Sequence, residues 1–387
     1  MARLKVYLFV AAILVAGMVA SPNLCWPQDL DMERLEGEVE ELKKKNEELE
    51  RRMENMEADE EEDKYNLGIL AGMVKISGYA DAELRLTDSE DENSGFRARH
   101  LSLFFNADVQ PSWRLFSEIE YEDTPFIESA HTTDNADTIQ GKIFVEQMYI
   151  EYHPSVNWDL RFGRYLTPAG IWSIYHYPPY VPTQTRPLMI RNIFPQVADG
   201  AQLRFSHPIG GSLLDTHLYA ANGAGNPGRL DRNESKAFGA RVNYSMDLLD
   251  HFDVGASYYR DKDNDDVTGN SYGAHLLVNY KDLELQSEFA TRYNDPEGAP
   301  GYTDTGFYAQ LAYDIGKWTL AGRFDWFDDE SIAAADKGSF RYTGAVNHHF
   351  AHNVVAKAEY NRNEFGDSGI KDYNEVVFAT VINIGDL

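Results

Sequence analysis

The chain has 387 residues and carries 63 Asp and Glu against 35 Lys and Arg, a formal net charge of −28. Such an acidic protein lacks the basic face that a phosphate backbone requires, so we expect no nucleic-acid partner. The only long apolar run is Val6 to Ala20, which excludes a membrane protein of several helices, and the single cysteine, Cys25, excludes a disulfide framework or a multi-thiolate site.

The first 28 residues are typical of an export signal. Arg3 and Lys5 provide a positive start, and Val6 to Ala20 provide an apolar segment that is short for a membrane span. An uncleaved anchor helix is the alternative. We expect residues 1–28 to be a signal peptide, with cleavage between Ala20 and Gln28.

Residues 29–64 show the 3-4 spacing of a coiled coil, flanked by charged residues. A buried amide such as Asn46 fixes the register of partner helices, which favours an oligomer. The alternative is a solvated acidic helix or tail, because the segment ends in the charge run Glu60 to Asp63. We place the coiled coil in the periplasm, with core residues that include Leu35, Val39, Leu42, Asn46, Leu49 and Met53.

From Tyr65 onward, apolar and polar residues alternate with period two, between turn residues. This pattern predicts sixteen strands: Met73–Thr87, Phe96–Val109, Trp113–Glu122, Lys142–His153, Trp158–Tyr165, Gly200–His207, Leu213–Ala221, Lys236–Met246, Phe252–Arg260, Ser271–Tyr280, Leu283–Tyr293, Thr305–Asp314, Trp318–Phe327, Ser339–Phe350, Val354–Asn363 and Tyr373–Ile384. One strand alone cannot show whether its apolar face meets a soluble core or lipid.

The links between the predicted strands decide that question. They alternate strictly between tight turns, such as Lys281-Asp282, and longer acidic loops. An even number of strands with short turns on one side is typical of an outer-membrane barrel, and a soluble sandwich has no reason to keep this alternation. We therefore predict a membrane all-β fold over residues 65–387, a 16-stranded antiparallel outer-membrane β-barrel. Aromatic residues near the strand ends, such as Trp113, Trp158 and Trp318, are expected to meet the lipid interfaces.

The longest link, Leu166 to Ala198, combines six prolines with aromatic and basic residues and is too long for a simple cap. Nearby motifs resemble the phosphate-selective porin O/P family, outer-membrane porins: Phe96 to Leu101, Glu146 to Tyr152, Leu160 to Pro168 and Asp199 to Leu203. The resemblance implies trimeric sixteen-stranded channels in the bacterial outer membrane, whose corresponding loop folds into the lumen. This chain departs from the family in ending on Leu387 without a terminal aromatic residue, and in having few lysines.

By strand parity the lumen wall is mixed, since basic and acidic side chains both point inward. Arg186 and Arg191 of the long link are expected to form a basic constriction opposite Arg114, Arg161 and Arg204, and thus a weak anion preference. We expect the pore lining and constriction to include Arg114, Arg161, Arg186, Arg191, Arg204, Tyr175, Tyr177, Glu118 and Glu120.

No motif supports catalysis or a cofactor, and we expect neither an enzyme nor a metal site. Asp261 to Asp266 lack the glycine of a calcium loop, and His348, His349 and His352 have no carboxylate at ligand spacing. Two functions remain open. One is passive diffusion of small hydrophilic solutes or ions, with anions such as phosphate among them; the other is a barrel scaffold or sheath that docks a periplasmic or electron-transfer partner.

Overall fold

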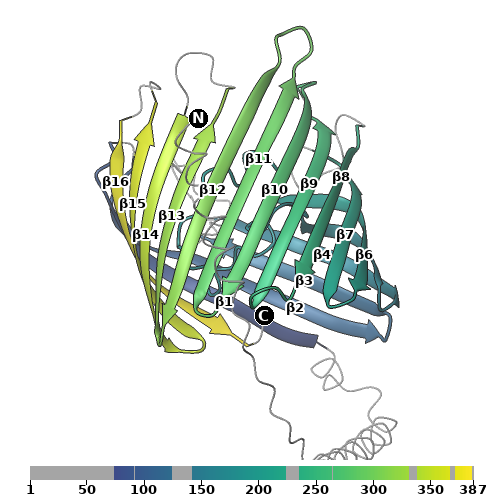
Figure 1. Ribbon diagram of the computed structural model, residues 1–387, viewed down its shortest axis with the longest axis horizontal. Helices are drawn as coiled ribbons and strands as arrows, with labels where there is room; N and C mark the ends of the chain where they lie inside the picture. Colours follow the sequence, from purple (N-terminus) through teal and green to yellow (C-terminus); the bar gives the residue numbers. More distant parts are fainter. Residues whose placement is uncertain are drawn as a thin grey trace, which may run out of the picture. The chain divides into compact units, whose positions relative to one another are not determined.

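The computed structural model describes residues 74–90, 92–123, 142–223, 235–263, 265–330, 338–366 and 371–385. The segments predicted as signal peptide and coiled coil, 1–28 and 29–64, lie outside these residues. Within the described ranges the chain forms sixteen antiparallel strands that close into a barrel (Figure 1). The strands are β1 Val74–Thr87, β2 Gly95–Gln110, β3 Trp113–Glu122, β4 Lys142–Ser155, β5 Trp158–Leu166, β6 Val197–Ile209, β7 Ser212–Ala221, β8 Ala237–Met246, β9 His251–Lys262, β10 Thr268–Tyr280, β11 Leu283–Asp295, β12 Tyr302–Ile315, β13 Trp318–Asp328, β14 Gly338–Ala351, β15 Val354–Phe365 and β16 Tyr373–Ile384.

Each strand pairs with its neighbours in the sequence, and β1 pairs with β16 from Gly78↔Ile384 to Thr87↔Glu375. This last pairing leaves no unpaired strand edge within the barrel, which is the condition for a sheet to lie in lipid. The sixteen predicted strands are confirmed, with ends that move by at most a few residues. No helix among the described residues is long and apolar enough to cross a membrane.

Tight turns join β2 to β3, β4 to β5 and each later even-numbered strand to the next, so they gather at one end of the barrel. Gly210 and Gly316 occupy two of these turns with φ of 63° and 62°, a left-handed conformation that suits glycine. By the rule for such barrels this end faces the periplasm. The longer links lie at the opposite end.

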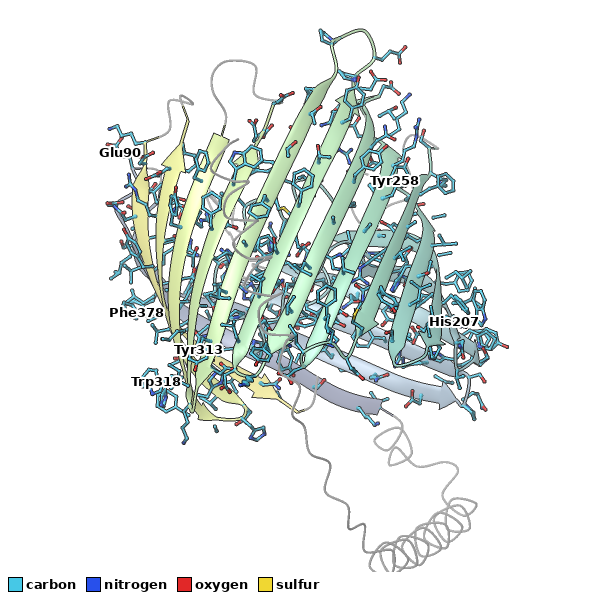
Figure 2. The ribbon with its side chains drawn as sticks, viewed as in Figure 1. Glu90, His207, Tyr258, Tyr313, Trp318 and Phe378 are labelled. Carbon is cyan, nitrogen blue, oxygen red and sulfur yellow. The ribbon has the colours of Figure 1, made fainter. Side chains whose placement is uncertain are left out.

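The outer surface of the barrel is apolar. On β13, Trp318 and Leu320 are 49% and 42% exposed, whereas Arg323 and Asp325, of the opposite parity, are buried inside. Figure 2 shows the side chains of Tyr313, Trp318 and Phe378 on the outer face of the wall. The apolar parity therefore faces outward, as a lipid-facing wall requires.

Candidate pore and constriction loop

The link between β5 and β6, residues 167–196, lies inside the barrel, and we call it the constriction loop. Its backbone is held by inward carboxylates of the wall: Trp172 N donates to Glu288 on β11 (2.7 Å), and Leu188 N donates to Asp325 on β13 (3.3 Å). On the opposite wall, Gln147 on β4 donates to the Tyr177 hydroxyl (3.1 Å). The loop therefore reaches across the lumen.

The loop folds inward because its apolar side chains find an apolar patch on the inner wall. Ala169, Met189, Ile193 and Phe194 are buried against wall residues, a set that comprises Tyr149, Tyr165, Ala198, Tyr219, Ala221, Ala237, Tyr259, Ala290, Tyr308 and Phe327. Gly306 on β12 leaves room for this contact, since a Cβ there would lie 2.3 Å from the Met189 Cβ. The barrel thus contains a small hydrophobic core of its own.

Two buried wall residues hold the middle of the loop. Arg323 on β13 donates to the Thr185 carbonyl (2.8 Å), to Thr183 Oγ1 and to Asp325 (2.8 Å). Glu359 on β15 accepts from Gln184 N (2.5 Å), Thr185 N (3.1 Å) and Thr185 Oγ1 (2.5 Å). Because charge-assisted hydrogen bonds are the stronger ones, these two side chains fix the loop at Thr183 to Thr185.

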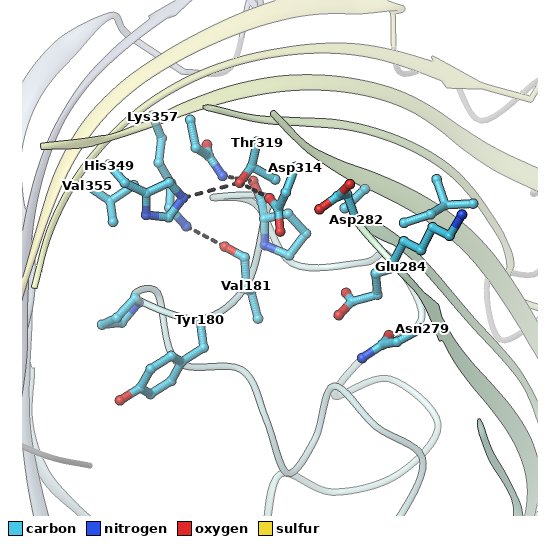
Figure 3. Close-up of a pocket in the computed structure, with 16 residues that line it drawn as sticks. Tyr180, Val181, Asn279, Asp282, Glu284, Asp314, Thr319, His349, Val355 and Lys357 are labelled. Carbon is cyan, nitrogen blue, oxygen red and sulfur yellow. Dashed lines mark hydrogen bonds between the residues drawn. The ribbon is translucent and has the colours of Figure 1, made fainter. Parts of the chain in front are cut away.

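A cavity of about 240 Å³ lies on the side of the loop that faces the tight turns (Figure 3). Lys357 on β15 lines the cavity and donates hydrogen bonds to the loop carbonyls of Pro178 (2.7 Å) and Val181 (2.6 Å). Its lining contains three carboxylates beside the tight turns, Asp282, Glu284 and Asp314, and two lysines, Lys281 and Lys357. This cavity forms the periplasmic side of the candidate pore.

A second cavity, of about 230 Å³, adjoins the loop through Val181, which lines both spaces. Five arginines line it, and we call it the basic cavity: Arg85, Arg99, Arg186, Arg191 and Arg341. Carboxylates Glu83, Glu120 and Glu375 share the lining. Arginines thus outnumber carboxylates in the lining of this cavity.

The arginines of the basic cavity differ in their partners. Arg85 contacts Glu375 (2.6 Å), and Arg99 contacts both Glu122 (2.8 Å) and Asp123 (2.7 Å). Among the described residues, no carboxylate lies within 4 Å of the guanidinium of Arg186 or Arg341. Instead, Arg341 donates to the carbonyl of Arg186 (3.1 Å). These two arginines therefore keep more of their positive charge available to a solute.

Burial, with the nearby charge of Arg191 as a second cause, lowers the pKa of Arg186 to about 10. Arg186 therefore still carries its proton at neutral pH. Burial also lowers the pKa of Arg191, whose guanidinium lies 3.8 Å from Glu146. The backbone at Arg191 is left-handed, with φ of 72°, a conformation that costs a residue with a Cβ about 1 kcal/mol or more.

The structure corrects the expected surroundings of Arg186 and Arg191. Arg114 and Arg161 both bind Glu151, and Arg204 binds Asp215 (3.0 Å), close to the tight turns. None of the three lines the basic cavity. Arg186 and Arg191 instead lie with Arg85, Arg99 and Arg341, because the loop crosses toward β1, β2 and β14.

The other predicted site residues lie in two settings. Tyr175 on the loop is 64% exposed, whereas Tyr177 packs its ring against Tyr79 and Phe104, with ring centroids 5.9 Å and 5.4 Å apart. Glu118 and Glu120 on β3 are almost fully buried rather than open to solvent. Their hydrogen-bond donors are residues of the inner wall: Ser102 and Gln147 donate to Glu118, and Tyr79 donates to Glu120.

Sequence reasoning missed Arg85, Arg99 and Arg341 as partners of the loop. The alternation of residues along a strand could have predicted that Arg85 and Arg341 point inward, because they have the same parity as the buried residues Glu83 and Thr343. The alternation does not predict the direction of Arg99, because this residue lies at an irregularity in the pairing of β1 with β2. There His100 and Ala98 pair with the consecutive residues Asp81 and Ala82, so Arg99 has no partner residue on β1.

Comparison with known proteins agrees with this geometry. A family model described as Gram-negative porin matches residues 58–368. A curated protein from Aquifex aeolicus (strain VF5), described only as uncharacterized, is 33% identical over 122 residues, 32% of this chain. The chain spans about a quarter (26%) of the length of that relative.

Two solved structures share the fold. The anion-selective porin from Comamonas acidovorans has a TM-score of 0.59 at 12% identity, with 80% of this chain and 99% of that chain covered. The trimer form of OmpT, an outer membrane protein of Vibrio cholerae, has a TM-score of 0.55 at 14% identity, with 80% and 98% covered. At such identities the likeness shows the fold alone, whereas the family match covers well over half of this chain. The chain belongs to the Gram-negative porin family, and it is a protein of the bacterial outer membrane.

Proposed function

We propose that this porin passes small hydrophilic solutes with a preference for anions, and that the constriction loop sets both its aperture and its charge. The observation that carries the proposal is the basic cavity beside the loop, in which Arg186 and Arg341 have no carboxylate within 4 Å among the described residues. Ring-like groups of basic side chains are a known means of anion selection in pores.

The overall charge of −28 does not oppose this preference. Charges in solvated loops are screened beyond about 10 Å at 0.1 M salt, whereas charges in a narrow passage with low-dielectric walls act on every ion that passes. The local excess of arginine in the basic cavity therefore outweighs the distant acidic loops.

Oxyanions such as inorganic phosphate are the anions that this lining favours most. A guanidinium is planar and binds two oxygens of one anion, and several guanidinium groups converge on the basic cavity. The resemblance to phosphate-selective porins supports the same substrate class. The carboxylates in the lining keep the preference weak.

The test is the reversal potential of the purified full-length porin in a planar bilayer under a potassium chloride gradient. Wild type should prefer chloride, and Arg186→Ser/Arg191→Ser should shift the reversal potential toward cations and enlarge the single-channel conductance. Phosphate added to one side should reduce the chloride current of wild type more than that of the double variant.

A matched control removes two positive charges from exposed positions, Arg260→Ser/Lys371→Ser, and should leave the reversal potential unchanged. A wild-type channel that prefers cations, or a double variant with unaltered selectivity, would contradict the anion preference. A purified barrel that never opens would contradict conduction and favour a sheath that docks a partner.

We further propose that three copies assemble through their barrels in the outer membrane lipid. The trimer form of the similar Vibrio cholerae structure supports a homotrimer, and so does the resemblance to trimeric phosphate-selective porins. In this arrangement residues 1–28 are removed as a signal peptide, residues 29–64 form a periplasmic coiled coil, and residues 65–387 form the channel.

A further inference from the structure

Three buried glutamates gather on the wall behind the constriction loop, and we call them the glutamate cluster: Glu118 and Glu120 of β3 and Glu146 of β4. They are 0%, 3% and 1% exposed, and each offers a carboxylate oxygen within 4.8 Å of those of the other two. Burial of three carboxylates so close together is costly unless their charge is balanced. The cluster therefore needs either bound protons or a positive partner.

The described residues supply only part of that positive charge. Arg191 lies 3.8 Å from Glu146, and no other Arg or Lys among the described residues lies within 4 Å of the cluster. The remaining contacts of Glu118 and Glu120 are neutral donors: Ser102 and Gln147 each donate to Glu118 (2.8 Å), and Tyr79 donates to Glu120 (2.8 Å). With all three carboxylates ionised, the cluster and this one guanidinium carry a formal charge of −2.

Two neighbouring atoms at this place have no hydrogen-bond partner among the described residues and point to a ligand. Glu146 Oε1 accepts from Gln196, but Glu146 Oε2 is buried without a hydrogen-bond partner among the described residues. His176 of the loop, 9% exposed, brings Nε2 to 3.5 Å from Glu146 Oε1, and this nitrogen also has no hydrogen-bond partner there. Buried polar atoms are almost always paired, so two such atoms at one place call for an explanation.

We propose that the glutamate cluster binds one divalent cation of the hard, oxygen-preferring class, such as Ca²⁺. A +2 ion matches the −2 balance, and oxygens up to 4.8 Å apart suit ligands about 2.3 to 2.6 Å from a calcium ion. Glu120, His176 and Arg191 also line the basic cavity, so the cluster adjoins a space that solutes occupy. Glu146 is the member of the cluster that contacts the loop, through Gln196 and Arg191.

A second group of ligand type, His100 with Glu120 and Glu122, lies beside the cluster and is the weaker candidate. Its members are already paired, since Glu122 contacts Arg99 (2.8 Å) and His100 contacts Asp81 (2.8 Å). Glu146, with its unused oxygen, is therefore the residue whose change distinguishes the two positions.

The test is calorimetric titration of Ca²⁺ into the full-length porin, refolded in detergent without lipopolysaccharide at neutral pH. Wild type should bind one Ca²⁺ per chain at a saturable site, and Glu146→Gln should weaken that binding at least about tenfold, because carboxylate charge sets calcium affinity. Glu118→Gln is a second variant in case Glu146→Gln does not fold. The matched control is Glu284→Gln, which removes a wall carboxylate of the other cavity and should leave binding unchanged.

Wild type without a saturable site would overturn the proposal, as would equal weakening by Glu284→Gln, which would mark diffuse attraction to an acidic protein. The calorimetric test measures calcium binding and no current, so its result is independent of the proposed anion preference. As a second readout, removal of Ca²⁺ with a chelator should increase the open-channel noise of wild type but not of Glu146→Gln.

Discussion

Glu359 offers the sharpest test of how the barrel wall holds the constriction loop. Its buried carboxylate accepts two backbone hydrogen bonds, from Gln184 N and Thr185 N, and one from Thr185 Oγ1. A hydrogen bond to a charged group contributes about 1.5 to 3 kcal/mol. Glu359→Gln keeps the shape but removes the charge and replaces one accepting oxygen with a donor.

We expect this substitution to weaken docking of the loop at Gln184 and Thr185 by about 2 to 4 kcal/mol, which raises the undocked population roughly thirty- to a thousand-fold. Trp172 stays bound to Glu288, so the loop remains in the lumen. Single-channel recordings should show brief excursions to larger conductance that wild type lacks.

The control for Glu359→Gln is Asp253→Asn, a carboxylate on β9 that contacts His251 (3.1 Å), lines neither cavity and should leave the current steady. Heat-modifiable migration in detergent verifies that both variants fold. Currents of Glu359→Gln that match wild type in amplitude and noise would refute the reasoning, because they would show that the carboxylate does not hold the loop.

Three further predictions follow from the wall, the assembly and the loop. Phe324→Arg places a charge on the outward face of β13 and should lower the free energy of unfolding, measured with urea in bilayers, by about 2 to 4 kcal/mol. Phe324→Leu should lower it by about 1 kcal/mol. An Arg variant with unchanged stability would mean that this position does not face lipid. A protein that begins at Tyr65 should still crosslink as a trimer, and a monomer would show that the coiled coil sets the assembly. Because the pKa of Arg186 is about 10, anion preference should hold at neutral pH and decline as pH rises through about 10; Arg186→Ser should not show this decline in its reversal potential, and a wild type with a flat profile would contradict the role of Arg186.

The number, order and inward parity of the strands could be predicted from the sequence because their signals are local. Alternation of period two marks each strand, and turn residues such as Gly316 mark its end. The same parity placed Arg323, Glu288 and Glu359 on the inner face, where the structure has them buried. A barrel in lipid follows from this pattern, since only closure pairs every strand edge.

Only the tertiary structure decided which side chains meet inside the barrel. Thr185 contacts Glu359 and Arg341 contacts Arg186, pairs separated by 174 and 155 residues, so no local spacing predicts them. The inward aromatic patch that receives the loop depends on the register of many strands together, as do the three glutamates behind it. Arg186 contacts Arg341 rather than Arg114 because packing and buried hydrogen bonds set the path of the loop across the lumen. Both depend on residues far away in the sequence, so the residues next to Arg186 do not predict them.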